Sequence, residues 1–299
     1  MARVALLISG LPRQWEHCVQ SQLALFQTTP CDVFFHFWDT VDAAEKPRIL
    51  TAYQPKAHRF EAQQDFSRFD QIITNYDSIN CPSRMMSMYA SWKAVGEVFT
   101  AYQRESGVQY DYAVRLRSDL MFFQSIEGVL TNVRPDTLVL TTFNNFGLVN
   151  DTFAVGGIAP ILYYHSLADH MLEYNRERTR ANPERMLIRH LTPPKNTKYR
   201  IGLMDLKVLV FRAHMVGMPI EECLRQDPGA TKWTDPEIVA WHRKVHGGWY
   251  GSVGLRHVDE FVEAKLSCLP PPISQAQSIP DSGVNQAAAN DSQEQPKSE

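Results

Sequence analysis

An uninterrupted apolar run at residues 4–8 constrains the fold of this chain more than any other feature. The run ends at Ser9 and Gly10, and a strand that is apolar on both faces is typical of a parallel sheet covered by helices. Apolar residues at helical spacing follow over residues 14–27, and a second, mostly apolar run occupies residues 32–38. Strand, helix and strand in this order predict a βαβ unit with a right-handed crossover, and therefore an α/β fold.

Apolar periodicities along the rest of the chain predict more elements of the same two kinds. Their order predicts a mostly parallel, Rossmann-like central sheet with helices on both faces. Helices are expected over residues 47–53, 85–103 and 160–179, and from Pro183 onward. Strands are expected over residues 57–61, 110–119, 138–140, 153–157 and 207–211.

The composition of the chain changes near its C-terminus. Pro, Ser, Gln, Ala and Asn dominate after residue 268, with almost no large apolar side chain. Such a segment cannot bury enough apolar surface to offset the conformational entropy that is lost on ordering. We therefore expect a single domain over residues 1–268 and a disordered tail over residues 269–299.

Net charge and cysteine spacing exclude several classes of function. The formal net charge is −3, so the chain lacks the basic excess of a dedicated nucleic-acid binder. None of its five cysteines forms a C-x-x-C pair, which argues against a zinc site or a disulfide framework. Free thiols in a reducing compartment are the simpler interpretation.

The apolar segments are also too short for membrane insertion. No window approaches the roughly 20 apolar residues that cross a bilayer, and the run over residues 4–8 is shorter than the apolar region of an export signal. We expect a cytoplasmic protein without a membrane span, and peripheral association stays open.

Three polar clusters stand where strands are predicted to end. They occupy residues 9–13, 36–39 and 115–119. Open α/β sheets bind their ligands in the crevice at the carboxyl ends of their strands. Each cluster alone could be an ordinary loop, and His36 in particular fits a structural role, but their coincidence predicts a ligand site at this edge of the sheet.

The cluster after residue 114 has the residue types of a phosphate site. In an extended strand Arg115, Arg117 and Asp119 would share one face, because side chains repeat every two residues. Guanidinium groups suit bidentate contacts to phosphate, and a carboxylate can hold Mg²⁺ or Mn²⁺ against a diphosphate or bind ribose and sugar hydroxyls. The alternative is an ion-paired strand end in which Asp119 only neutralises Arg117.

The loop after the first strand offers backbone N–H groups and one arginine. Ser9, Gly10 and Arg13 could contact a nucleotide. The loop lacks the glycines and the lysine of a phosphate-binding Walker loop, and it does not match the dinucleotide fingerprint. An ordinary strand-to-helix turn is the competing interpretation.

Six segments of the chain carry a resemblance to a known family. They are VALLISGLPR, DVFFHFWD, MYASWKA, YDYAVRLRSDLMF, NDTFAVGG and PERMLIRHL, in this order over about residues 3–195. In order and spacing they resemble GT-A glycosyltransferases of bacteria and viruses, of the kind tied to capsule or lipopolysaccharide assembly. The resemblance implies a GT-A-like sheet, a nucleotide-diphosphate sugar as donor and a glycan or other hydroxyl acceptor.

The resemblance also implies a donor site. Asp119 matches the last carboxylate of the DxD-like motif that holds the donor diphosphate through a divalent cation, Mn²⁺ or Mg²⁺. Arg117 stands at the position of the first carboxylate, which puts metal dependence in question. Arg212 and His214 could close over the diphosphate, with His214 as a further metal ligand. Taken together, the residues expected to bind the donor are Ser9, Gly10, Arg13, Arg115, Arg117, Asp119 and Arg212.

Two carboxylates are candidates for the general base. Asp151 opens the glycine-containing segment that resembles the part of the family beside donor and acceptor. Glu184 resembles the acid that opens a later helix and takes the acceptor proton in inverting relatives, although an acid in a first helical turn also favours the helix dipole. Residues 1–150 would then form the nucleotide-binding half and residues 151–268 the acceptor half.

Other functions remain open from the sequence. A catalytically degenerate nucleotide-sugar-binding protein would also explain the arginine in the DxD-like motif. A nucleotidyltransferase shares a similar sheet but usually has a loop richer in glycine and lysine after its first strand. A glycoside hydrolase needs two carboxylates flanking one bond, and no such pair can be located.

Overall fold

The computed structural model describes residues 2–76, 81–141, 149–204, 206 and 208–226. The predicted tail over residues 269–299, and the predicted acceptor half beyond residue 226, lie outside the described residues. None of the described helices is long and apolar enough to cross a membrane.

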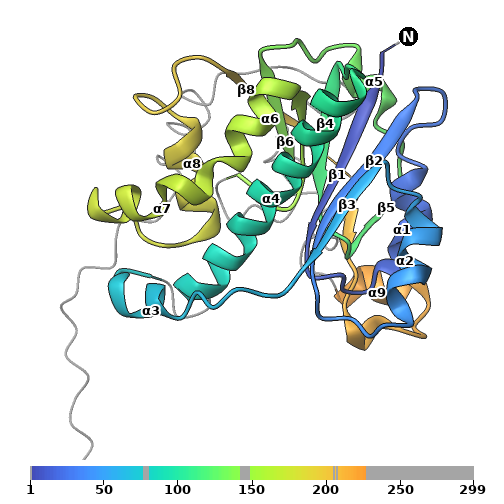
Figure 1. Cartoon of the computed structure of the whole chain (residues 1–299), viewed down its shortest axis with the longest axis horizontal. Helices are drawn as coiled ribbons and strands as arrows, with labels where there is room; N and C mark the ends of the chain where they lie inside the picture. The colour runs from blue at the N-terminus through green and yellow to red at the C-terminus, as the bar shows by residue number, and fades with distance from the viewer. Residues whose placement is uncertain (1, 77–80, 142–148, 205, 207, 227–299) are drawn as a thin grey trace, which may run out of the picture. The chain divides into compact units, whose positions relative to one another are not determined.

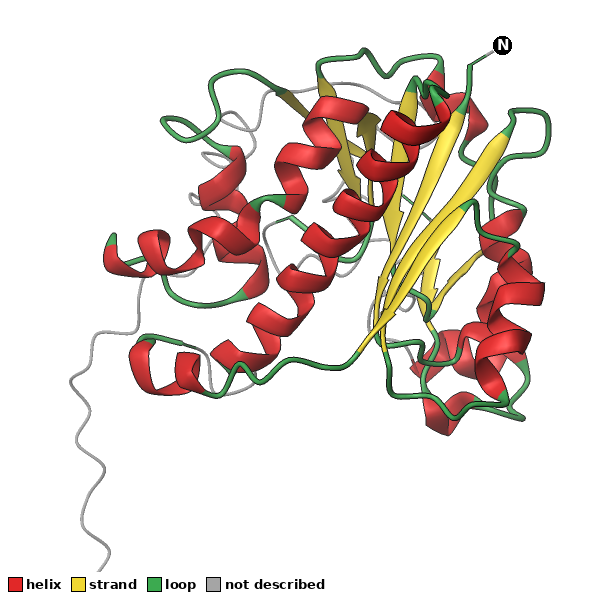
Figure 2. Cartoon of the chain, in the orientation of Figure 1, coloured by secondary structure: helices red, strands yellow, loops and turns green. Residues whose placement is uncertain are grey.

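Within the described residues, the central sheet has seven strands in the order β3-β2-β1-β4-β7-β6-β8 (Figure 2). Only β7 runs antiparallel to its neighbours, β4 and β6, and the other pairs are parallel. The predicted mostly parallel α/β sheet is therefore confirmed. The strands are β1 Val4–Gly10, β2 Cys31–Trp38, β3 Ala57–Glu61, β4 Tyr112–Leu116, β6 Thr137–Thr141, β7 Ala154–Gly157 and β8 Arg200–Met204.

Strand β1 lies in the middle of the sheet because both of its faces are apolar. Ala5 and Leu7 face a core formed with α4, Pro82–Ser106, and Val4, Leu6 and Ile8 face a second core formed with α1, Trp15–Leu23, and α2, Glu45–Tyr53. Burying one such aliphatic side chain contributes about 1.5–3 kcal/mol. Helices cover both faces of the sheet as the sequence predicts (Figure 1).

The predicted helix over residues 160–179 is two helices, α6 Ile158–His165 and α7 Leu167–Arg176. They meet at Ser166, whose hydroxyl donates a 2.7 Å hydrogen bond to the carbonyl of Tyr163. A serine that bonds to the backbone in this way competes with the helical pattern. The helix from Pro183 is present as α8, Pro183–Leu191.

The chain also departs from the predicted strands. Strand β4 ends at Leu116, and after a turn a short strand, β5 Leu120–Phe122, pairs antiparallel with β9 Val208–Val210. The late strand expected over residues 207–211 thus belongs to a separate two-stranded sheet. Some elements had no sequence pattern that predicted them: β5, β8, α3 Arg68–Ile72, α5 Glu127–Leu130, the 3₁₀ turn Ala213–Met215 and α9 Ile220–Gln226.

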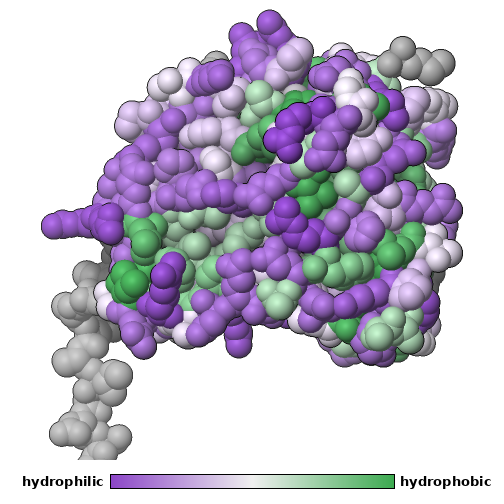
Figure 3. All heavy atoms as spheres, viewed as in Figure 1, coloured by the Kyte–Doolittle hydropathy of each residue, from purple (hydrophilic) through white to green (hydrophobic). Residues whose placement is uncertain are grey.

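Hydrophilic residues cover most of the face drawn in Figure 3, with smaller apolar areas between them. The large apolar side chains that are exposed among the described residues come from several segments: Leu23, Ile72, Tyr76, Phe123 and Val216. Apolar side chains exposed singly are normal on a folded domain.

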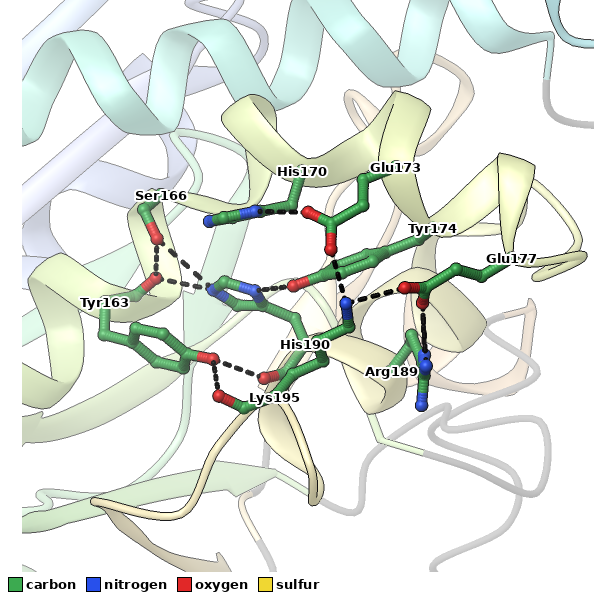
Figure 4. A network of polar contacts seen from close by, with 9 residues as sticks. All are labelled: Tyr163, Ser166, His170, Glu173, Tyr174, Glu177, Arg189, His190 and Lys195. Atoms are coloured by element: carbon green, nitrogen blue, oxygen red, sulfur yellow. Dashed lines mark hydrogen bonds and ion pairs between the residues drawn. The ribbon is translucent and has the colours of Figure 1, made fainter.

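A polar network around His190 joins α6, α7 and α8 (Figure 4). The Nε2 atom of His190 lies 2.7 Å from the carbonyl oxygen of Tyr163, so Nε2 carries the proton. The Nδ1 atom then accepts a hydrogen bond from the hydroxyl of Tyr174 at 2.8 Å. The imidazole also stacks on the ring of Tyr163, with centroids 4.2 Å apart. Lys195 adds an ion pair to Glu177 at 2.7 Å. Neutral His190 is therefore the form that this network holds.

Lowering the pH from 7 to 5 is expected to reduce the free energy of unfolding. Burial lowers the pKa of His190 to about 4, against an ordinary value of 6.5, so the unfolded chain binds this proton more readily. The stabilisation is fully present above about pH 6.5 and is lost as the pH falls towards the folded pKa, with a loss of about 2 kcal/mol at pH 5. Urea unfolding at the two pH values measures the difference.

The same measurement on His190→Gln should give a smaller loss between pH 7 and pH 5. Part of the loss should remain, because burial lowers the pKa of His165 to about 3 and acts in the same direction. An equal loss in the wild type and in His190→Gln would contradict the assignment.

Candidate functional site

A cleft of about 540 Å³ opens at the carboxyl ends of β1, β2 and β4. Six of the residues predicted to bind a donor line it: Ser9, Gly10, Arg13, Arg115, Arg117 and Asp119. The structure thus brings together residues from two loops that are about a hundred positions apart in the sequence. The rest of the wall includes Trp38 at the end of β2, Gln63 and Phe66 after β3, and Ser87 of α4.

A second cleft of about 720 Å³ adjoins the first. Both are lined by Leu11, Arg13, Gln63 and Asp119, and Arg212 lines the second. Arg13 and Asp119 therefore lie between the two clefts. A ligand bound at this junction can extend into either of them.

An ion pair of Arg117 and Asp119 forms the centre of the junction. The Nε and Nη2 atoms of Arg117 donate to the two carboxylate oxygens of Asp119 at 2.9 and 2.6 Å. Burial lowers the pKa of Arg117, but the charge of Asp119, its hydrogen bonds with Arg117 and the charge of Asp151 together outweigh burial and raise the pKa overall. Asp119 is only 2 % exposed, so the ion pair is largely shielded from water.

Arg212 reaches the same carboxylate from a distant part of the chain. Its Nη1 lies 3.7 Å from Oδ2 of Asp119. The preceding residue, Phe211, donates its backbone N–H to the carbonyl of Asp119 at 2.8 Å, beside the pairing of β5 with β9. The two-stranded sheet therefore places Arg212 beside Asp119. Its expected contact with a donor diphosphate stays a prediction.

Gln22 of α1 fixes the loop that carries the ion pair, and sequence reasoning missed it. Its side-chain amide donates to three carbonyls, those of Arg117, Ser118 and Leu120, at 2.9–3.2 Å. Its oxygen accepts the hydroxyl of Tyr53 at 2.9 Å. A glutamine on an amphipathic helix gives no sequence signal for such a role. Gln22 is a positioning residue for Arg117 and Asp119.

The loop after β1 is tied to the loop after β4. The hydroxyl of Ser118 donates to the carbonyls of Leu11 and Arg13 at 2.8 and 3.1 Å. Gly10, at the end of β1, has φ +117°, a left-handed conformation that favours glycine. The chain turns there, and the turn brings Arg13 to the junction of the two clefts.

Arg115 does not lie where the sequence analysis expected it. Because β4 ends at Leu116, the expected face shared by Arg115, Arg117 and Asp119 at a strand tip does not form. Arg115 is fully buried inside the sheet, with Cζ 4.3 Å from the ring centroid of Trp92. Its Nη1 donates to the backbone carbonyl of Asp151. Arg115 still forms part of the wall of the first cleft, on the side of the protein core.

The two candidate bases lie near the same buried tyrosine, Tyr89, and outside the walls of both clefts. Burial raises the pKa of Tyr89, and the charges of Asp151 and then Glu184 raise it further, so both carboxylates act on one buried hydroxyl. Asp151 is 8 % exposed, whereas Glu184 is half-buried in the first turn of α8. The helix is capped by Asn182, whose side chain accepts the N–H of Arg185 at 3.0 Å.

The described residues do not fit a divalent cation at Asp119. Both of its carboxylate oxygens accept hydrogen bonds from Arg117, and Arg212 adds a second positive charge. His214, the other expected metal ligand, is exposed in the 3₁₀ turn. The part of the chain that the structure describes holds no cluster of three His, Cys, Asp or Glu side chains suited to a metal.

The geometry supports anion binding at the junction. Arginines suit phosphate oxygens in bidentate geometry. Arg13 lines both clefts, Arg117 lines the first and Arg212 lines the second, and the last two lie beside Asp119. No protein-family model and no curated protein sequence matches the chain.

Proposed function

We propose that this protein is a GT-A-type glycosyltransferase that moves a sugar from a nucleotide-diphosphate sugar to a glycan or another hydroxyl acceptor. The observation that carries the proposal is an arginine cluster where two clefts adjoin: Arg117 and Arg212 lie beside Asp119, and Arg13 lines both clefts. Open α/β sheets bind nucleotides at this edge. Two clefts that meet at one anion site suit a reaction with a donor and an acceptor.

The arginine cluster would stabilise the leaving group. Transfer leaves a nucleoside diphosphate, whose negative charge increases as the bond to the sugar breaks. Guanidinium groups that are already in place stabilise this charge more in the transition state than in the bound donor, and such contacts speed a reaction. Asp119 would keep Arg117 in position, since it holds two of the donors of that guanidinium.

The first cleft would take the nucleoside. Its volume of about 540 Å³ is in the range of small-molecule sites, roughly 300–1,000 Å³. Trp38 and Phe66 line it with ring centroids 6.2 Å apart, and the amide of Gln63 donates to the hydroxyl of Ser87 at 3.3 Å. Aromatic faces can stack on a base or a ribose, and amide and hydroxyl groups can bond to its edge.

A carboxylate would take the acceptor proton if the reaction inverts the sugar. Glu184 and Asp151 are the candidates. Glu184 is the more exposed of the two, so it is the better placed to meet an acceptor from solvent.

We expect UDP, GDP or CDP to bind with its diphosphate at Arg13, Arg117 and Arg212. A thermal-shift screen against the three nucleotides, followed by calorimetry, tests this. A ligand at 100 times its Kd stabilises the native state by about 2.7 kcal/mol, which is a readable rise in melting temperature. Each nucleotide is tested with Mn²⁺ and with a chelator, and the rise should not depend on the metal. Absence of binding for all three would remove the donor site.

A catalytically degenerate nucleotide-sugar-binding protein is the second candidate. Two observations favour it: Arg117 replaces a carboxylate of the DxD-like motif, and neither Asp151 nor Glu184 lines the clefts. The two candidates differ in turnover. Slow hydrolysis of a bound nucleotide sugar supports the enzyme, and tight binding without hydrolysis or transfer to any acceptor in a glycan panel supports the binding protein.

A further inference from the structure

Unpartnered polar atoms gather in one place behind the first cleft. Among the described residues, the buried side-chain nitrogens and oxygens without a hydrogen-bond partner all belong to Ser9, Trp92, Arg115 and His165. They are Ser9 Oγ, Trp92 Nε1, Arg115 Nε and Nη2, and both ring nitrogens of His165. Buried polar atoms in folded proteins are nearly always hydrogen-bonded, so this concentration calls for a ligand.

Arg115 lies at the centre of the group. Its Cζ is 4.3 Å from the ring centroid of Trp92, and Trp92 stacks on Tyr164, the residue before His165. Burial, and after it the charge of Arg115, lower the pKa of His165, so these two side chains are also electrostatic neighbours.

Ser9 joins the group through the sheet. In the parallel pairing of β1 and β4, Arg115 is opposite Leu7, and Ser9 is the next residue of β1 on the same face. Ser9 and Arg115 both line the first cleft. They therefore connect the unpartnered atoms to a space that a ligand can reach.

Nearly all of these atoms are hydrogen-bond donors. Arginine and tryptophan nitrogens only donate, and a serine hydroxyl and one nitrogen of a neutral histidine can donate as well. The rings of Trp92 and Tyr164 face the guanidinium of Arg115 and stabilise its charge, but they accept no ordinary hydrogen bond. A set of donors around a buried cation selects an anion with several acceptor oxygens.

Arg115 also presents the edge that binds oxyanions best. Its Nη1 is used by the carbonyl of Asp151, which leaves Nε and Nη2, two parallel donors on one side of the guanidinium. This edge makes bidentate contacts to carboxylate and phosphate groups. In Arg117 the same edge is already occupied by Asp119.

We propose that Arg115 and Ser9 form a buried oxyanion subsite at the inner end of the first cleft, separate from the junction at Asp119. The inference rests on the proposed function for the identity of the ligand. The oxyanion comes either from the diphosphate of the nucleotide or from a carboxylate on the transferred sugar, as in a nucleotide-linked uronic acid.

Calorimetry on Arg115→Met tests the subsite, with inorganic phosphate, glucuronate, UDP, UDP-glucose and UDP-glucuronate as probes. The matched control is Arg104→Met, which removes the same charge from an exposed site at the far end of α4. Loss of a bidentate contact to a charged group should weaken binding by about tenfold or more in Arg115→Met. Arg104→Met should bind like the wild type.

The probes separate the two sources of the oxyanion. If the diphosphate enters the subsite, Arg115→Met weakens UDP, UDP-glucose and UDP-glucuronate alike. If the sugar carboxylate enters, wild-type protein prefers UDP-glucuronate over UDP-glucose, and only this preference disappears in the variant. Equal binding of every probe by Arg115→Met and the wild type would overturn the subsite.

Stability measurements separate a ligand site from a structural role. Because most of its donors have no partner, replacing Arg115 with methionine should leave the melting temperature unchanged or raise it. A large fall in the melting temperature of Arg115→Met would show that the arginine serves packing. Ser9→Ala, a small change, then decides: the inference stands if this variant weakens binding of the same probes about threefold or more, and is overturned if it does not. Phosphate or glucuronate binding that needs Arg115, without any nucleotide binding, would keep the subsite and reject the proposed function.

Discussion

Asp119→Asn is expected to reduce sugar transfer by about 100-fold or more, as for other preorganised electrostatic contacts. The substitution keeps the size of the side chain but removes the charge that holds Arg117 through two hydrogen bonds and attracts Arg212. The guanidinium groups would then repel each other, and the diphosphate would meet a disordered cluster. Initial rates with a donor and acceptor identified by screening measure the effect.

The same substitution should also lower stability, by about 2–3 kcal/mol, because Asp119 is buried and ion-paired. A carboxylate at an exposed strand tip would cost much less. Asp136→Asn is a matched control. Asp136 is half-exposed, and its carboxylate lies 3.8 Å from nitrogens of Arg134 and Arg200. It lines neither cleft. Near-normal turnover of Asp119→Asn would reject the junction as the active centre.

Arg117→Met is expected to lower the transfer rate by about 100-fold or more, while a chelator leaves the wild-type rate unchanged. The reason is the composition of the junction, where Arg117 and Arg212 surround the one carboxylate that a cation would need. Rates with EDTA, Mn²⁺ and Mg²⁺ on wild type and variant measure both effects, with Arg134→Met as the control for removal of an exposed charge.

A rate that vanishes with EDTA and returns with Mn²⁺ would contradict this account of the leaving group. Asp119 would then have to release Arg117 in order to bind the metal. In that case Arg117→Met should bind the metal more tightly, because the substitution removes the guanidinium that competes for the carboxylate of Asp119.

The strand and helix pattern of the first half of the fold could be predicted because it depends on local burial. The run over residues 4–8 is apolar on both faces, and the structure buries it between two helical layers. Strand β5 has only three residues, and its partner β9 lies about ninety positions later. No local periodicity marks a strand whose stability comes from a distant edge.

The site could be predicted in its residue types but not in its geometry. Alternation along residues 115–119 indicated one shared face, but the chain turns after Leu116, so Arg115 is buried and Arg117 pairs with Asp119. The role of Gln22 depends on three carbonyls that only the folded turn brings together. Sequence patterns report which side a residue faces, whereas hydrogen-bond partners depend on tertiary contacts.

The position of β7 has a consequence for the way the chain is synthesised. This strand lies between β4 and β6, although it follows both in the sequence. While the ribosome has made only residues 1–150, β4 is an open sheet edge whose inner face carries a buried arginine, and its future partner is missing. Open edges attract other chains, so the nascent protein is exposed to aggregation until residues 154–157 emerge and insert. The first 150 residues therefore cannot complete the sheet without the part of the chain that follows them.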